Sequence, residues 1–567
     1  MLEGCTTWPT ERAERYRRDG LWRGESLVRL LADAARVHGP KTALVGGGRR
    51  LNYAELESGA RRMAAGFRAR GIAPDDRVVV QLPNTPDFVV VCFALFLVGA
   101  KPVFALPAHR SNEIRHLCEL SGAVGYVFPG VVRGFDFPAL ARQMREDVAS
   151  LRYLFVQGGD GDGQDAAGPA RGGDAPVPLA EVDADPAGGG DFPVPDPSDV
   201  AFFLLSGGTT ALPKLIPRTH DDYAYQVRAA GEASGLTDRD VYLATLPVEF
   251  NFTWGCPGVV GVLRAGGTVV FAEDPTPEHC FPLIEREGVT MTSVVPSVVQ
   301  LWLEGAEWLE DDLSSLRLLQ IGSAKLHRET AEQIEPAFGC RLQQVFGMAE
   351  GLCTFTRDGD PAETVLTTQG RPISAADEIK IVDEEDRELP AGGIGELLTR
   401  GPYTLQGYYR APEHNAKAFT PDGFYRTGDL ARLTEDGDLV IEGRIKDVVI
   451  RGGDKVSAAE VEGHLLAQPG VARAAVIPVP DQFLGERICA YLVAAEGVEP
   501  PSLPELKQAL HDRGLAEFKL PDRVVYVEDL PLTGLGKIDK KALGALARGE
   551  ALPETGAFIP VGEAVAR

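Results

Sequence analysis

"LLSGGTTALPKLIPRTH", from Leu204 to His220, places a run of small and hydroxylated residues ahead of a single lysine, Lys214. Backbone N–H groups and hydroxyls in such a loop can surround phosphate oxygens, and the lysine adds a point charge. The loop differs from the GxxxxGK(S/T) loop of common nucleotide hydrolases, because Lys214 follows a proline. The stretch predicts a phosphate-binding loop of another kind, with a flexible turn as the alternative.

Apolar segments rich in Val, Ile and Phe alternate with amphipathic segments on both sides of this loop. "NYAELESGARRMAAGFRARG" (52–71) predicts a helix, and the apolar stretch from Val89 to Val98 predicts a buried helix. Strands are expected within 76–84, 101–106 and 316–324. This alternation is typical of α/β layers with buried, largely parallel strands.

The composition and the residue pattern of the chain change at two places. Gln157 to Asp199 is saturated with Gly, Asp and Pro, which predicts a mobile surface excursion rather than a domain linker. From Glu378, Asp-Gly and Gly-Gly turns between short strands predict antiparallel hairpins. The predicted fold class is α/β. We expect a large N-terminal domain of layered sheets and helices with a β-barrel-like subdomain (1–445), and a small mobile α+β C-terminal domain (446–567) whose tail is weakly structured.

Composition narrows the possible partners. The formal net charge of −25 over 567 residues argues against nucleic acid or an anionic membrane surface as a non-specific partner. The eight cysteines show no CxxC or zinc-ligand spacing, as is usual in a reducing compartment. The N-terminus lacks a signal-peptide apolar region, and the longest apolar stretch is interrupted at Lys101. The sequence predicts a soluble, cytoplasmic protein, and leaves monomer and homodimer open.

Six ordered segments together resemble the adenylate-forming enzymes, which comprise acyl-CoA synthetases, luciferases and nonribosomal-peptide adenylation domains. Their phosphate loop reads roughly S/T-S/G-G-S/T-T-G-x-P-K, and Ser206–Lys214 matches except at Ala211, where the family has glycine. The other segments are "IGSAK" (321–325), "QVFGMAEG" (344–351), "YRTGDL" (425–430), "GRIKDVVIRGGDKV" (443–456) and "PLTGLGKIDKKAL" (531–543). Taken alone, each segment is equally typical of a turn, a helix cap or a surface charge. The ordered set is specific for this family, and the resemblance spans roughly residues 25 to 545.

The resemblance implies that the chain binds ATP and Mg2+. It implies that Phe346 stacks on adenine, that Glu350 binds Mg2+, and that Asp429 accepts hydrogen bonds from the ribose hydroxyls. It also implies that Lys446 is a domain hinge and that Lys537 is delivered to the site by domain closure. The implied catalytic residues are Lys537, Lys214 and Glu350. The implied nucleotide-binding residues are Ser206, Gly207, Gly208, Thr209, Thr210, Lys214, Gly322, Ser323, Ala324, Val345, Phe346, Gly347, Asp429, Arg444 and Lys537.

Within the family, the chain resembles the stand-alone aryl-acid–AMP ligases. "LPVEFNFTWGCPG" (246–258) aligns with their aryl-pocket motif, which often reads H-N-Y-P-L-S-S-P-G. The implied pocket residues are Phe250, Asn251, Phe252, Cys256, Ser323, Val345 and Cys353. Asn251 matches an asparagine that meets the 2-hydroxyl and carboxylate side of the ring. Phe252 and Cys256 replace a tyrosine and a serine, and an unpaired buried substrate hydroxyl costs about 1–3 kcal/mol.

These replacements favour a salicylate-type acid over 2,3-dihydroxybenzoate. Phe250 and Trp254 replace a histidine and a smaller aliphatic residue, and with Ser323 they leave a hydroxyquinaldate or hydroxypicolinate as further alternatives. A buried cysteine is also an ordinary small apolar residue, which would still give an apolar pocket.

The implied reaction forms an acyl-adenylate from an aryl acid and ATP, with release of pyrophosphate. The acyl group would then pass to the phosphopantetheine thiol of a separate carrier protein, as in nonribosomal peptide or siderophore-type biosynthesis, since the chain contains no carrier module of its own. An aryl-CoA ligase using free CoA shares every motif. A catalytically silent adenylation-fold binding protein is the non-enzyme alternative; intact Lys537, Glu350, Asp429 and Arg444 oppose it, and Ala211 weakly favours it.

Overall fold

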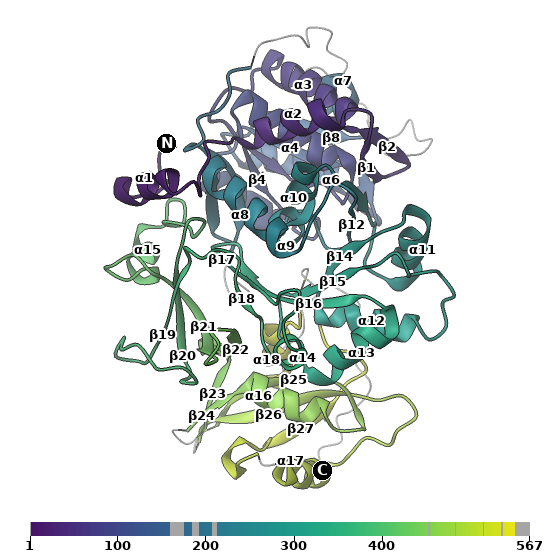
Figure 1. Cartoon of the computed structure of the whole chain (residues 1–567), viewed down its shortest axis with the longest axis vertical. Helices are drawn as coiled ribbons and strands as arrows, with labels where there is room; N and C mark the ends of the chain where they lie inside the picture. Colours follow the sequence, from purple (N-terminus) through teal and green to yellow (C-terminus); the bar gives the residue numbers. More distant parts are fainter. Residues whose placement is uncertain are drawn as a thin grey trace.

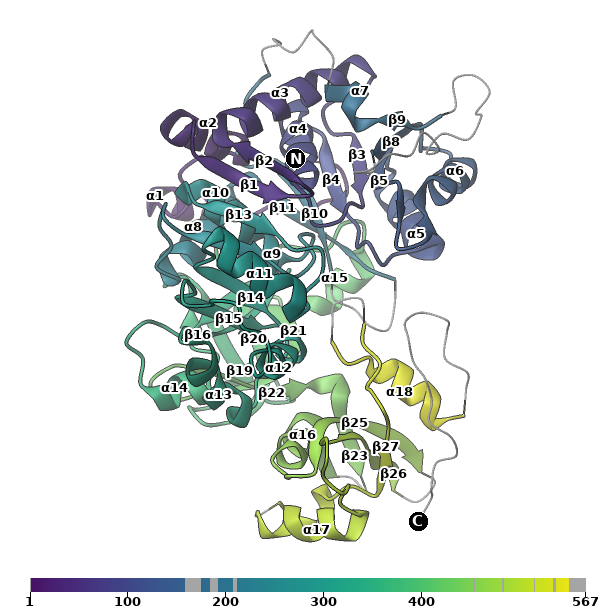
Figure 2. The same ribbon diagram turned by 90° about the vertical axis from the view of Figure 1, so that its right-hand side faces the viewer.

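A computed structural model describes residues 2–158, 175–183, 192–206, 212–451, 454–481, 484–513, 515–533 and 537–549. It shows a large N-terminal domain of layered sheets and helices, with a smaller α+β C-terminal domain packed below it in the view of Figure 1. Figure 2 shows the same two parts from the side. The predicted fold class is confirmed.

A seven-stranded sheet contains the first predicted strands. Its order is β11-β10-β4-β3-β5-β8-β9, parallel except for the antiparallel pair β10–β11. Its strands are almost wholly buried, in keeping with their continuous apolar runs. The strands are β3 (Arg77–Val80), β4 (Lys101–Phe104), β5 (Gly125–Pro129), β8 (Tyr153–Gln157), β9 (Val177–Pro178), β10 (Val200–Leu205) and β11 (Leu215–Thr219).

A nine-stranded sheet carries most of the site. Its order is β18-β17-β16-β15-β14-β12-β13-β1-β2, and the run from β16 to β1 is parallel. The strands are β1 (Thr42–Gly46), β2 (Arg49–Asn52), β12 (Val241–Ala244), β13 (Thr268–Phe271), β14 (Met291–Val294), β15 (Leu318–Gly322), β16 (Arg341–Met348), β17 (Gly351–Phe355) and β18 (Arg371–Pro372).

The helices of the large domain lie mostly on the faces of these two sheets, whereas α1 and α15 lie to one side in Figure 1. They are α1 (Thr10–Arg18), α2 (Leu27–His38), α3 (Tyr53–Ala69), α4 (Pro86–Val98), α5 (Ser111–Ser121), α6 (Phe137–Asp147), α7 (Leu179–Asp183), α8 (His220–Ala233), α9 (Asn251–Gly255), α10 (Gly258–Ala265), α11 (Pro277–Glu287), α12 (Pro296–Gly305), α13 (Arg328–Phe338), α14 (Ala362–Thr367) and α15 (Pro412–Ala418).

Helix α4 is the buried helix that the sequence predicts, and it begins at Pro86, three residues before Val89. Every residue of α4 except Asp87 is buried, which explains why the helix is apolar on all sides. Among the described residues, no helix has both the length and the apolar character needed to cross a bilayer.

The hairpins expected after Glu378 form a four-stranded antiparallel sheet, β19 (Glu378–Val382), β20 (Gly395–Arg400), β21 (Tyr425–Leu433) and β22 (Leu439–Arg444). A 3-10 turn (Ile445–Asp447) then leads into the C-terminal sheet. That part contains β23 (Val448–Arg451), β24 (Asp454–Ser457), α16 (Ala458–Leu466), β25 (Val471–Asp481), β26 (Gly485–Ala494), α17 (Leu503–Asp512), β27 (Arg523–Tyr526) and α18 (Lys540–Ala547). It has hydrophobic clusters of its own.

The prediction of a mobile excursion over 157–199 is wrong for its described parts. β9 pairs in parallel with β8, and Leu179 and Val182 of α7 are buried. A Cβ at Gly66 of α3 would lie 2.1 Å from the Val182 carbonyl oxygen, so α7 packs closely on α3. The apolar residues of "PVPLAEV" bury this short piece despite the surrounding Gly, Asp and Pro. Residues 159–174, 184–191 and the tail from 550 lie outside the described ranges.

Candidate active site

The base of the phosphate loop is closed by two reciprocal hydrogen bonds. Ser206 N donates to the Lys214 carbonyl oxygen at 2.9 Å, and Lys214 N donates to Ser206 Oγ at 3.0 Å. These bonds continue the antiparallel pairing of β10 and β11 by one step. The loop residues Gly207, Gly208, Thr209 and Thr210, and the irregular Ala211, lie outside the described part of the chain.

Lys214 lies beside a series of hydrogen-bonded side chains that ends in Glu350. Its Nζ is 5.2 Å from the centre of the Tyr408 ring, within cation–π range. The Tyr408 hydroxyl donates to Glu350 Oε1 at 2.8 Å and lies 2.8 Å from the Tyr425 hydroxyl. Because a phenol has one proton, Tyr425 is the donor in that second bond. Burial raises the pKa of Glu350, and the bond from Tyr408 lowers it. Lys214 and Glu350 thus contact the same tyrosine, Lys214 at the ring and Glu350 at the hydroxyl.

Gly322 and Val345, two of the residues expected to bind the nucleotide, meet at the ends of two parallel strands. Gly322 of β15 lies opposite Val345 of β16, and a Cβ at Gly322 would be only 2.7 Å from the Val345 carbonyl oxygen. Ser323 follows with φ +70°, a left-handed conformation that costs a non-glycine residue about 1 kcal/mol. Ser323 and Ala324 are exposed, and Phe346 is half-buried beside Gly347.

Asp429 and Arg444 face each other across β21 and β22. They are register partners, and Arg444 Nε donates to Asp429 Oδ1 at 3.0 Å. The Asp429 side chain is buried, whereas that of Arg444 is 44 % exposed. The pair can therefore offer a fixed carboxylate to a ligand approaching from solvent. Lys446 lies in the 3-10 turn directly after β22, and its hinge role stays a prediction.

Asn251, at the start of α9, is held by three hydrogen bonds. Its Oδ1 accepts from the Tyr223 hydroxyl at 3.0 Å and from Gln226 Nε2 at 2.9 Å, and its Nδ2 donates to the Met348 carbonyl oxygen at 3.2 Å. Both oxygen lone pairs are then used, and one of the two N–H donors is committed. Asn251 can offer a ligand one N–H donor and no acceptor.

Cys256 and Cys353 are in contact although they lie far apart in the chain. Their Sγ atoms are 3.5 Å apart, and Gln226 Nε2 lies 3.6 Å from Cys256 Sγ as a donor. The hydrogen bond to Cys256, together with burial, raises the pKa of Cys353. Phe252 and Val345 belong to the same buried cluster. The structure thus brings Phe252, Cys256, Val345 and Cys353 into one buried cluster, whereas Asn251 lies in a polar network and Ser323 is exposed.

Phe250 packs against the edge of this cluster, but Trp254 does not belong to it. Trp254 meets Phe88 and Phe104 edge-to-face, with ring centres 5.5 and 5.6 Å away, in the cluster around α4. The expectation that Trp254 reshapes the aryl pocket is wrong. Residues two positions apart in an α-helix are rotated by about 200° around the helix axis. Phe252 and Trp254 therefore point to opposite sides of α9.

Lys537 lies in the C-terminal domain, in a short turn before α18. Thr533 N donates to the Lys537 carbonyl oxygen at 2.7 Å, and Lys537 N donates to Thr533 Oγ1 at 3.3 Å. Figure 2 shows the segment that leads into α18 extending from the C-terminal sheet toward the large domain. The position suits a group brought to the site by domain movement, and the catalytic role of Lys537 stays a prediction.

The motifs did not reveal the residues that hold the pocket in place. Arg218 is fully buried; it donates from Nε to Asp222 Oδ1 at 2.9 Å and from NH2 to Gln226 Oε1 at 2.8 Å. Gln226 in turn holds Asn251, as does Tyr223. A signal was present in "HDDYAYQVRAA", because so many polar residues on a helix flanked by apolar strands indicate an internal network.

Comparison with known proteins identifies the class of enzyme to which this fold belongs. The AMP-binding enzyme family matches residues 31–409, and the AMP-binding enzyme C-terminal domain matches residues 460–537. The chain belongs to the AMP-binding enzyme family.

Its relatives include stand-alone aryl-acid ligases. It is 50 % identical over 543 residues to the 2,3-dihydroxybenzoate-AMP ligase of Bacillus subtilis, covering 96 % of this chain and 97 % of that protein. It is 46 % identical over 547 residues to the salicyl-AMP ligase / salicyl-S-ArCP synthetase of Mycobacterium tuberculosis, covering 96 % and 94 %. The solved apo structure of Mycobacterium smegmatis MbtA superposes with a TM-score of 0.72 at 45 % identity, covering 95 % and 98 %. The resemblance seen in the sequence is confirmed.

Proposed function

We propose that this protein activates an aryl carboxylic acid with ATP and then transfers it to a thiol. The observation that carries the proposal is the adjacency of two sets of side chains. Asn251, fixed through Gln226, donates to the Met348 carbonyl oxygen, two residues before Glu350 on the same segment. An acid bound at Asn251 would therefore lie beside the groups suited to hold phosphates.

In the first step, a carboxylate oxygen of the acid attacks the α-phosphorus of ATP. The bond to the bridging oxygen breaks, and pyrophosphate leaves with the electron pair. Negative charge from two anions must be offset at this point, and preorganised cations lower that barrier. Lys214 lies at the base of the phosphate loop, and Lys537 would bridge the carboxylate and the α-phosphate after domain closure.

Glu350 is suited to Mg2+ because this ion usually binds through one or two carboxylates and the phosphates of the substrate rather than through a protein cage. Bound there, the ion would supply further positive charge at the phosphates. Tyr408 keeps the Glu350 carboxylate oriented and favours its ionised form.

In the second step, a thiol sulfur attacks the acyl carbon of the adenylate, and AMP leaves. We propose the phosphopantetheine of a separate carrier protein as the thiol, in nonribosomal peptide or siderophore-type biosynthesis. The name of the mycobacterial relative refers to such an acceptor. Free CoA is the alternative, and assays with each acceptor separate the two.

For the acid itself, we propose a salicylate-type 2-hydroxybenzoate. The single available N–H of Asn251 suits one oxygen acceptor, and the sulfur wall of Cys256 and Cys353 offers poor partners for a 3-hydroxyl. The alternative is 2,3-dihydroxybenzoate, favoured by the 50 % identity to the Bacillus ligase.

ATP–pyrophosphate exchange over a panel of aryl acids tests both the activity and the choice of acid. The panel should contain salicylate, 2,3-dihydroxybenzoate, benzoate, 3-hydroxypicolinate and 3-hydroxyquinaldate. We expect the highest kcat/KM with salicylate. Absence of exchange with every acid would favour a silent binding protein, and preference for 2,3-dihydroxybenzoate would overturn the proposed acid alone.

A further inference from the structure

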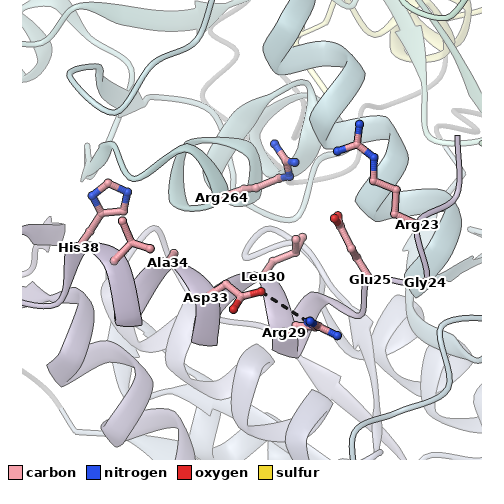
Figure 3. A pocket seen from close by; sticks show the side chains of 10 residues that line it. Arg23, Gly24, Glu25, Arg29, Leu30, Asp33, Ala34, His38 and Arg264 are labelled. Atoms are coloured by element: carbon pink, nitrogen blue, oxygen red, sulfur yellow. Dashed lines mark ion pairs between the residues drawn. The ribbon is translucent and has the colours of Figure 1, made fainter. Parts of the chain in front are cut away.

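A cavity of about 360 Å³ lies between α2 and α10, and Figure 3 shows the side chains that line it. This volume is in the range of small-molecule sites. Arg23 and Glu25, which precede α2, line one part, and Arg264 in the last turn of α10 lines the opposite side. Neither Asn251 nor any other predicted site residue contributes to it.

Two guanidinium groups in this cavity have no anionic partner. In the described part of the chain, neither Arg23 nor Arg264 has a carboxylate within 4.0 Å, whereas Arg29 is paired with Asp33 at 3.5 Å. Figure 3 shows the guanidinium groups of Arg23 and Arg264 directed toward one another above Glu25. The Arg264 Nε atom is buried without a hydrogen-bond acceptor. Arg23 and Arg264 thus give the cavity a cationic side that no ion pair among the described residues neutralises.

A third guanidinium adds to the crowding of positive charge. Arg228 donates to the Leu21 carbonyl oxygen at 2.7 Å, so its hydrogen bonds are committed to the protein. Burial lowers the pKa of Arg228, and the charges of Arg23 and Arg264 lower it further, whereas those of Glu25 and Glu232 raise it. In a chain with a net charge of −25, such a concentration of cations marks a place suited to an anion.

The charge and shape of the cavity indicate which anion fits. Arg29 and Asp33 offset each other. Glu25 forms no ion pair with Arg23 or Arg264, but its negative charge leaves a net charge of one positive unit among the three, which suits a monoanion. Leu30, Ala34 and Val37 line the α2 side at helical spacing and form an apolar floor. A ligand with one carboxylate and an apolar ring satisfies both parts of the cavity, whereas inorganic phosphate would leave the floor uncovered.

We propose that the cavity between α2 and α10 is a second, non-catalytic binding site for an aryl monocarboxylate, held by Arg23 and Arg264. Only the choice of an aromatic body for the ligand rests on the proposed function. Arg264 lies at one end of α10, and the other end begins at Gly258, close in sequence to Cys256. A ligand there would join α2 to the helix that follows the aryl-pocket segment.

Calorimetric titration of the full-length protein with benzoate, without ATP, tests the proposal. Asn251→Ala serves as the parent, because it weakens binding at the active site. We expect the parent to retain one binding event, and Arg264→Gln or Arg23→Gln in that parent to weaken it at least about tenfold, the loss of one charge-assisted contact. Arg29→Gln is the matched control, since Arg29 lines the same cavity but is already paired. Glu25→Gln should strengthen binding.

Melting temperatures of every variant verify folding, and benzoate should raise the melting temperature of the parent but not of the Arg264→Gln variant. Equal affinity of the parent and both arginine variants for benzoate would contradict the proposed site. Tighter binding of inorganic phosphate than of benzoate would overturn the ligand class. ATP–pyrophosphate exchange is measured separately on the wild-type chain, so failure of the proposed function and failure of this site remain distinguishable.

Discussion

Gln226 donates a hydrogen bond of 2.9 Å to Asn251, and with this contact α8 fixes the amide that the aryl acid would meet. Gln226 Oε1 accepts in turn from Arg218, so the orientation of the Gln226 amide is determined by a charged group. The amide that we propose to meet the acid is thereby held in place before any ligand arrives.

Replacing Gln226 by leucine should loosen Asn251 without altering the phosphate-binding groups. We expect KM for the aryl acid to rise about 10–100-fold, corresponding to the 1–3 kcal/mol of an unsatisfied buried partner, while KM for ATP stays unchanged. Steady-state exchange kinetics measure both. Gln333→Leu, on the exposed surface of α13, is the control. An equal rise in both KM values would contradict a specific effect on the acid.

Tyr408→Phe should shift the pH dependence of adenylation. The hydroxyl lowers the pKa of Glu350, so its removal raises that pKa, and the acidic limb of the kcat profile should move to higher pH. Tyr409→Phe is the matched neighbour, because the Tyr409 ring packs on Phe203 and not on the carboxylate. An acidic limb that stays in place in Tyr408→Phe would argue that ionisation of Glu350 does not limit the reaction.

A Phe252→Tyr, Cys256→Ser double variant should gain on 2,3-dihydroxybenzoate relative to salicylate. Two hydroxyls then become available to a 3-hydroxyl, and each new bond contributes about 1 kcal/mol. The ratio of kcat/KM for the two acids should change at least about fivefold. Cys340→Ser alters a cysteine elsewhere in the same buried cluster and should leave the ratio unchanged. A constant ratio in the double variant would remove the specificity argument.

Lys537→Ala should reduce adenylate formation by several orders of magnitude while leaving ATP affinity within about threefold, because the lysine acts on charge that develops in the transition state. Pyrophosphate exchange and equilibrium nucleotide binding provide the two measurements. Lys541, exposed on α18, is the control position. Normal exchange in Lys537→Ala would show that another group supplies this charge.

Asp377 should make the folded state less stable as the pH rises. Burial raises the pKa of Asp377 to about 8, although Tyr403 donates to its Oδ2 at 2.6 Å. Between the ordinary carboxyl range and pH 8 the folded state holds a proton that the unfolded chain has lost. Its contribution is therefore fully present at low pH and is lost as pH rises through about 8. Asp377→Asn should flatten this part of the stability profile in urea titrations at pH 5 to 9, and an unchanged slope would contradict it.

Much of this architecture follows from the sequence because its signals are local. The apolar runs of β3 and β4, and the all-apolar α4, could be predicted from residues that are neighbours in the chain. The ordered motifs likewise placed Lys214 and Glu350 at one site, and the structure brings both into contact with Tyr408.

What the sequence did not reveal depends on contacts between distant segments. The hydrogen bond between Tyr408 and Glu350 joins residues that are 58 positions apart. The bond between Arg218 and Gln226 affects the site only through the further bond from Gln226 to Asn251. Trp254 was assigned to the pocket from its place in a motif, and only the turn of α9 shows that it points to the other side. The sequence did not predict the short helix α7, because the surrounding Gly, Asp and Pro residues suggested a flexible segment. Burial of Leu179 and Val182 nevertheless orders it.

The reciprocal bonds between Ser206 and Lys214 have a consequence for how this protein can vary over evolution. They fasten the loop at its base, so the register of β10 and β11 does not depend on the residues between them. We therefore expect substitutions between Ser206 and Lys214 to leave the pairing of these two strands intact. Activity could then change by substitution between these two residues without loss of the sheet that supports them.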